Sequence, residues 1–332
     1  MSFDVETLYG RRADERWNRM AVGDILERMT WSDPDKVAII AAPDAVADPR
    51  YARISYRQAN QTANQLANAL LSWGLDRGDR VAMLCENSGE AYLTKIAIAK
   101  AGLVAVPVNT MMADDMVADV LDRVGARTAV VDADLWPARE PIFAAAGIRP
   151  MAVSRGREPG PAGVPEFGDV VAASPAGEPD VRIHGDDIWE ILLTSGTTSM
   201  PKAVMISHTY SYTAAMSHAL SYSRSLPVES DLRICSFLPV IYHIGDRAYV
   251  LSAFFLVRRQ CGAGAQADGG GGRRRGHPRE GDHHLGRVAA VPWRPGPGGG
   301  RAPGHLRPER RRGHHLRLDH GRPLQGRHQV RR

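Results

Sequence analysis

The chain has 332 residues, of which 43% are hydrophobic and 24% charged, with a formal net charge of +5. This length suits one large domain or two ordinary ones, and no apolar run is long enough for a transmembrane helix. The first residues are acidic and lack an apolar signal core, so we expect a cytoplasmic protein without integral membrane contact. The three cysteines, Cys85, Cys235 and Cys261, are odd in number and far apart. They argue against a disulfide framework or a zinc cluster, and we expect two of them to be buried free thiols.

The net charge hides two different compositions that meet near residue 257. Residues 258–332 hold 18 of the 42 basic and 5 of the 37 acidic residues, a net charge of +13, whereas residues 1–257 carry −8. The tail also holds 17 of the 33 glycines and 8 of the 12 histidines, and it contains no Lys, Ile, Met, Thr, Tyr, Phe or Asn. We therefore expect a folded part, 1–257, and a tail, 258–332.

Helical and strand patterns alternate along the first part. A helix is predicted near residues 22–29, and Ser55 with Gln58 forms a capping box at the start of a second that ends at Gly74. Further helices are predicted at 90–101, 113–124, 138–146, 210–223 and 248–257. Strands are predicted at 36–41, 81–85, 103–108, 128–132, 188–193 and 233–238. Residues 155–187, rich in Gly, Pro and Ala, are predicted to be a surface linker. The alternation predicts an α/β fold with mainly parallel sheets flanked by helices.

A loop rich in hydroxyl groups lies between two apolar runs that predict a hairpin. Its hydroxyls and backbone N–H groups could hold a polyphosphate, its glycine allows close approach, and its lysine supplies charge. The candidate phosphate-binding residues are Thr194, Ser195, Gly196, Thr197, Thr198 and Lys202. Pro201 and Ala203 exclude a Walker loop, and composition alone favours an ordinary Ser/Thr-rich surface turn.

The whole string from Thr194 to His208, Thr-Ser-Gly-Thr-Thr-x-x-Pro-Lys-x-Val-x-x-Ser-His, closely resembles the phosphate-binding signature of the adenylate-forming acyl-CoA synthetases. Ser199 and Ala203 stand where that family usually has glycine. Residues 54–59, 78–81 and 99–109 are similar to other segments of the family, so the resemblance covers roughly 20–257.

Residues 238–245, Leu-Pro-Val-Ile-Tyr-His-Ile-Gly, resemble the family's Leu-Pro-x-x-His-x-x-Gly segment, whose aromatic or His residue lines the acyl pocket near the adenylate. The spacing is one residue long before His243 and one short after it. Either Tyr242 or His243 could take this role, and His243 could equally be a core histidine.

The resemblance implies that ATP, with Mg²⁺, and CoA are substrates together with a small-molecule carboxylate, by family a fatty acid. The family's Tyr-Gly-x-Thr-Glu segment, whose Glu helps bind magnesium, has no match, nor has the small C-terminal domain with its catalytic Lys. We therefore name no catalytic residue. The chain is expected to be an acid–CoA ligase by family, or alternatively a truncated, inactive remnant with weak nucleotide binding. Neither the acyl chain length nor the oligomeric state follows from the sequence.

Three explanations compete for the tail. Its arginines could bind nucleic acid, but Trp293 is the only aromatic residue available for stacking, which disfavours this partner. Its paired histidines lack ligand spacing, so a metal site is also disfavoured. Ordinary low complexity would leave it disordered. We favour a change of reading frame near residues 257–262, because a GC-rich gene read out of frame yields this composition.

Overall fold

The structure is a computed structural model that describes residues 20–41, 46, 48–154, 160–194, 201–223, 234–236, 238–255 and 288–290. By internal contacts the chain divides into a unit of residues 1–293 and a second unit of residues 294–332. All described residues belong to the first unit. The predicted boundary at residue 257 stays a prediction.

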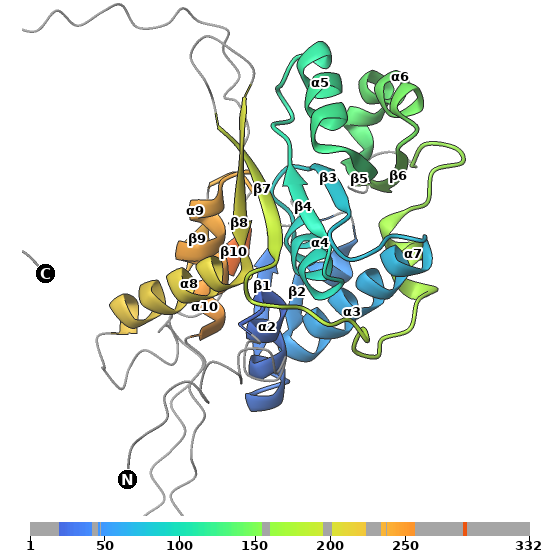
Figure 1. The fold of residues 1–332 in the computed structure, drawn as a ribbon. Coiled ribbons are helices and arrows are strands. Elements are labelled where there is room, and N and C mark those ends of the chain that lie inside the picture. Colours follow the sequence, from blue (N-terminus) through green and yellow to red (C-terminus); the bar gives the residue numbers. More distant parts are fainter. Residues whose placement is uncertain are drawn as a thin grey trace, which may run out of the picture. The chain divides into compact units, whose positions relative to one another are not determined.

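The helices and strands follow one another along the chain as predicted for an α/β protein (Figure 1). The helices are α2 (Val22–Ser32), α3 (Tyr56–Ser72), α4 (Gly89–Lys100), α5 (Asp114–Val124), α6 (Trp136–Ala146), α7 (Phe167–Ala172), α8 (His208–Ser223), α9 (His243–Gly245) and α10 (Leu251–Phe255), with short segments η3 (Pro49–Tyr51), η4 (Ala133–Leu135) and the π-helical η6 (Asp246–Val250). The strands are β1 (Val37–Ala41), β2 (Arg53–Ser55), β3 (Arg80–Leu84), β4 (Val104–Pro107), β5 (Ala126–Asp132), β6 (Arg149–Val153), β7 (Ile188–Thr194), β8 (Lys202–Ser207), β9 (Cys235–Ser236) and β10 (Val288–Ala290).

A six-stranded sheet, in the order β6-β5-β3-β4-β7-β8, forms the centre of the first unit. Its strands run parallel from β6 to β7, and β8 closes one edge as the antiparallel arm of a hairpin with β7. Along β3, Val81 and Met83 join one buried cluster, which includes α3 and α4, while Ala82 and Leu84 join another, which includes α5 and α6. Both faces of this strand are covered, as expected for parallel sheets. The predicted α/β class with mainly parallel sheets is confirmed.

The local patterns account for much of this fold. Both hydrogen bonds of the capping box at the start of α3 are present. Ser55 Oγ accepts from the Gln58 N–H at 3.3 Å, and Gln58 Oε1 accepts from the Ser55 N–H at 2.8 Å. Gly125 ends α5 in the left-handed conformation, with φ of 61°, which favours glycine. Cys85 is buried, as predicted for two of the three cysteines, and its thiol donates to the Val130 carbonyl at 3.4 Å.

One prediction is wrong in part, and the tail contributes one strand. The supposed linker, residues 155–187, contains α7, whose Phe167 packs edge-on against Tyr51 with ring centroids 5.5 Å apart. In the tail, Val288–Ala290 forms β10, which lies between β1 and β9 and is parallel to both. An apolar Val-Ala-Ala triplet can complete a ladder that β1 and β9 leave open, and these three residues of the tail therefore belong to a sheet. The rest of the tail, with its nucleic-acid and frame-change hypotheses, lies outside the described residues.

Candidate functional site

The hairpin of β7 and β8 presents the two ends of the predicted phosphate loop at its tip. Thr194 pairs with Lys202 in the strand register, and both side chains are exposed. The Thr194 hydroxyl lies 3.4 Å from the Lys202 carbonyl oxygen, to which it donates. Arg123, from the last turn of α5, donates to the Pro201 carbonyl at 3.1 Å and fastens the hairpin to the neighbouring helix. Ser195, Gly196, Thr197 and Thr198 lie outside the described residues, so their part in the site stays a prediction.

The two candidates for the acyl side face in different directions. Tyr242 is 50% exposed, whereas His243 is only 7% exposed. His243 Nδ1 lies 2.5 Å from Glu190 Oε2, and its Nε2 lies 3.4 Å from the hydroxyl of Ser211. His243 is therefore held in the interior, and Tyr242 remains available at the surface.

Glu190 and His243 belong to a buried network of four ionisable side chains that the sequence patterns did not reveal. The ammonium of Lys95, from α4, lies 2.5 Å from Glu190 Oε1 and 2.5 Å from Asp246 Oδ2. It also donates to the Val240 carbonyl at 3.1 Å and lies 5.6 Å from the ring centroid of Trp189. One signal could have pointed to the network, namely single charged residues within otherwise apolar segments at Lys95 and Glu190.

Burial and ion pairing shift the pKa values of this network in opposite directions. Burial acts to lower the pKa of Lys95, but the two neighbouring carboxylates outweigh it and raise that pKa. Burial acts to raise the pKa of Glu190, but Lys95 and His243 outweigh it and lower that pKa. For Asp246, burial dominates and raises the pKa to about 6. The ammonium and the Glu190 carboxylate are thus a charged pair in the interior.

The same network contains the ligand types of a metal site. Ligand atoms of Glu190, His243 and Asp246 all lie within 4.8 Å of one another. The Lys95 ammonium, however, lies between the two carboxylates at hydrogen-bond distance and supplies the positive charge that a cation would bring. These residues fit an ion-pair network and do not fit the magnesium site that the resemblance implies.

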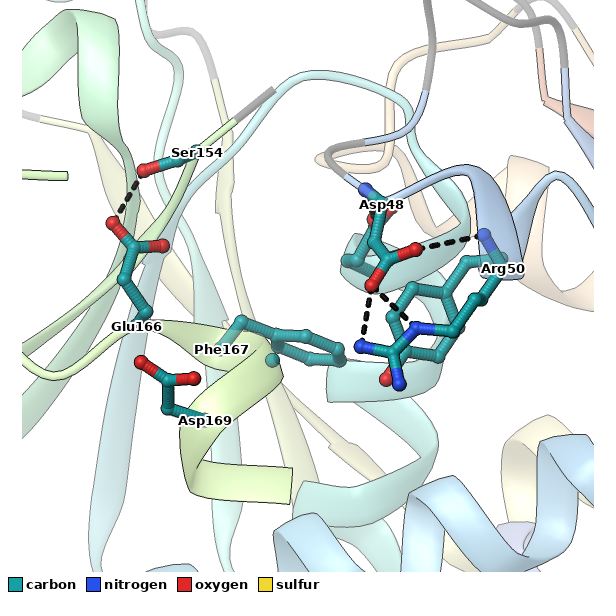
Figure 2. A pocket seen from close by; sticks show the side chains of 9 residues that line it. Asp48, Arg50, Ser154, Glu166, Phe167 and Asp169 are labelled. Atoms are coloured by element: carbon teal, nitrogen blue, oxygen red, sulfur yellow. Dashed lines mark hydrogen bonds and ion pairs between the residues drawn. The ribbon is translucent and has the colours of Figure 1, made fainter. Parts of the chain in front are cut away.

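A hollow of about 230 Å³ lies elsewhere, between α7, η3 and the end of β6 (Figure 2). The Arg50 guanidinium reaches Asp48, with Nε 2.6 Å from Oδ2, and this hydrogen bond lowers the pKa of Asp48. On the opposite wall the Ser154 hydroxyl donates to Glu166. These polar groups pair with one another across short distances, and the hollow contains none of the predicted site residues.

Comparison with known proteins identifies the class of fold and then the family. Solved structures of adenylate-forming ligases share the fold: an anthranilate–CoA ligase, AuaEII, in complex with anthranoyl-AMP has a TM-score of 0.62 at 23% identity, covering 71% of this chain and 43% of that one. ATP-bound MatB from Rhodopseudomonas palustris has a TM-score of 0.58 at 26% identity, with coverages of 71% and 44%. The model of the AMP-binding enzyme family matches residues 26–263, and the chain belongs to this family.

The curated relatives are acid–CoA ligases. A long-chain-fatty-acid–CoA ligase, FadD13 of Mycobacterium tuberculosis, is 35% identical over 167 residues, which are 50% of this chain and 32% of that protein. A crotonobetaine/carnitine–CoA ligase of Escherichia coli is 31% identical over 192 residues, which are 54% of this chain and 36% of the relative. The chain thus spans about a third of the length of these relatives. No helix among the described residues is long and apolar enough to cross a membrane.

Proposed function

We propose that this chain takes part in the ATP-dependent activation of a carboxylic acid, by family a fatty acid, to an acyl-adenylate and then to an acyl-CoA thioester. The observation that supports it best is the β7–β8 hairpin, whose tip places Thr194 opposite Lys202 within the family's phosphate signature. Its ligase relatives act on a long-chain fatty acid and on carnitine or crotonobetaine.

The proposed reaction has two steps. A carboxylate oxygen attacks the α-phosphorus of ATP, the bond to the bridging oxygen breaks, and pyrophosphate leaves. The CoA thiolate then attacks the acyl carbon and AMP leaves. Both steps depend mainly on positioning and on neutralising phosphate charge. The loop from Thr194 to Lys202 would hold the β- and γ-phosphates, with Lys202 as its cation. Mg²⁺, bound with the nucleotide, would neutralise further phosphate charge.

For the acyl side we propose Tyr242. It is half exposed, and its distances in sequence from Pro239 and Gly245 match the family segment, whereas His243 is engaged with Glu190 in the interior. We propose that His243 supports the segment and does not contact the substrate.

The test is acid-dependent exchange of radiolabelled pyrophosphate into ATP, measured with a series of fatty acids. Lys202→Ala should reduce exchange at least about tenfold, since it removes a charge-assisted contact to phosphate. The matched control is Arg53→Ala, which removes an exposed cation on β2, away from the hairpin tip, and should leave exchange unchanged. ATP binding without exchange would favour the alternative of an inactive remnant, and the absence of both would refute the proposal.

A further inference from the structure

The Lys95 ammonium joins three elements of the fold. Lys95 lies on α4, a helix in which every residue is buried. Glu190 lies on β7, four residues before Thr194 at the hairpin tip, and Asp246 begins η6, directly after the segment that carries Tyr242. A single ammonium therefore connects the strand that leads to the phosphate loop with the segment proposed for the acyl side.

The segment of residues 238–246 is fastened to the α4 region at several points. Asn87, just before α4, donates through its side-chain amide to the Leu238 carbonyl at 2.7 Å and accepts from the Val240 N–H at 2.7 Å. Lys95 adds the bonds to the Val240 carbonyl and to the carboxylate of Asp246. Tyr242 lies between these anchors, so the backbone on both sides of it is fixed relative to α4.

A second buried lysine on the same helix shows that this arrangement is particular to Lys95. The Lys100 side chain is 1% exposed and pairs with Glu178, which is 42% exposed and lies in the segment before β7. Lys100 also donates to Asn60 of α3 at 3.0 Å. It thus stabilises the fold without reaching residues 238–246. Both carboxylates of Lys95 are buried, and one of them belongs to that segment.

We propose, on the basis of the proposed function, that Lys95 is a positioning residue. By bridging Glu190 of β7 and Asp246 of η6, it holds Tyr242 at a fixed place relative to Thr194 and Lys202 at the tip of the β7–β8 hairpin. Lys95 is too deeply buried to contact substrate itself. Its contribution should appear with a ligand that occupies the acyl and phosphate sides together, because only such a ligand requires their relative placement.

The test compares two ligands in three purified full-length proteins. ATP probes the phosphate side, and a non-hydrolysable acyl-sulfamoyl-adenosine probes the acyl and nucleotide sides together. Lys95→Met alone leaves two buried carboxylates beside one histidine and risks unfolding. The main variant is therefore Lys95→Met with Asp246→Asn, which keeps the Glu190–His243 pair. Lys100→Met is the matched control.

In the double variant we expect the affinity for the acyl-adenylate analogue to fall at least about tenfold more than the affinity for ATP, a difference of about 1.4 kcal/mol. Lys100→Met should show no such difference. Equal weakening of both ligands, or no weakening, would overturn the positioning role. If the wild-type protein binds neither ligand, the proposed function fails. In that case, hydrogen exchange at the amides of residues 240–245 tests the positioning role of Lys95. Faster exchange in the double variant, but not in Lys100→Met, would support this role, and unchanged exchange would overturn it.

Discussion

His208, the last residue of the phosphate signature, should make the stability of the fold depend on pH. It is fully buried, its ring lies 6.3 Å from that of Trp189, and its Nδ1 accepts from the Val22 N–H at 3.1 Å, at the start of α2. Burial is the main cause that lowers its pKa to about 4; the Asp187 carboxylate opposes this shift, and Arg77 adds a smaller lowering effect. Accepting a hydrogen bond requires an unprotonated Nδ1, so a proton there would break the contact that holds α2.

The sign and size follow from this depressed pKa. The unfolded chain takes up a proton near the ordinary pKa of 6.5, whereas the folded protein does so only near 4. The free energy of unfolding therefore does not depend on His208 titration well above pH 6.5, and it falls as the pH drops below that value. The loss is about 2 kcal/mol at pH 5 and about 3 kcal/mol at pH 4.

The assay is urea unfolding of the wild type and of His208→Asn at pH 7 and pH 5. Asn removes the titration, and other titrating groups, such as Asp246, contribute to both proteins alike. We expect the wild type to lose about 2 kcal/mol more free energy of unfolding than the variant between these pH values. The same loss in both proteins would refute this account of His208. If the variant does not fold, the His208 pKa can be measured directly by NMR, and a value near 6.5 would refute the account.

Three further predictions concern stability and are checked by the same urea unfolding. Ser55→Ala should cost about 1 kcal/mol, because it removes the capping contact to the Gln58 N–H; an unchanged midpoint would contradict the cap. Gly23→Ala should destabilise by about 1–3 kcal/mol although alanine favours helices, since its Cβ would lie 2.5 Å from Lys100 Cγ. A more stable variant would show that this contact relaxes. Lys95→Met should lower the free energy of unfolding by about 3–5 kcal/mol, because it leaves the buried carboxylates of Glu190 and Asp246 without their ammonium partner. Lys100→Met should cost less, since its partner carboxylate can be hydrated, and the reverse order would be incompatible with the buried network.

The sequence by itself determined the elements that depend on near neighbours. The capping box at Ser55, the end of the same helix just before Gly74 and the β7–β8 hairpin all follow from residues a few positions apart, and the structure contains each of them. The signature from Thr194 to His208 also indicated the family, which the match over residues 26–263 confirms. These features survive because helix caps, turns and strand alternation are governed by local geometry.

Only the tertiary structure decided what lies at long sequence separation. Lys95 meets Glu190 across 95 positions and Asp246 across 151, and no local periodicity encodes such a meeting. The burial of His243 likewise depends on the Glu190 carboxylate, which comes from the distant strand β7. A charge enters the interior only where distant parts of the chain supply its partners, so these positions could be understood only once the sheet had brought α4, β7 and η6 together.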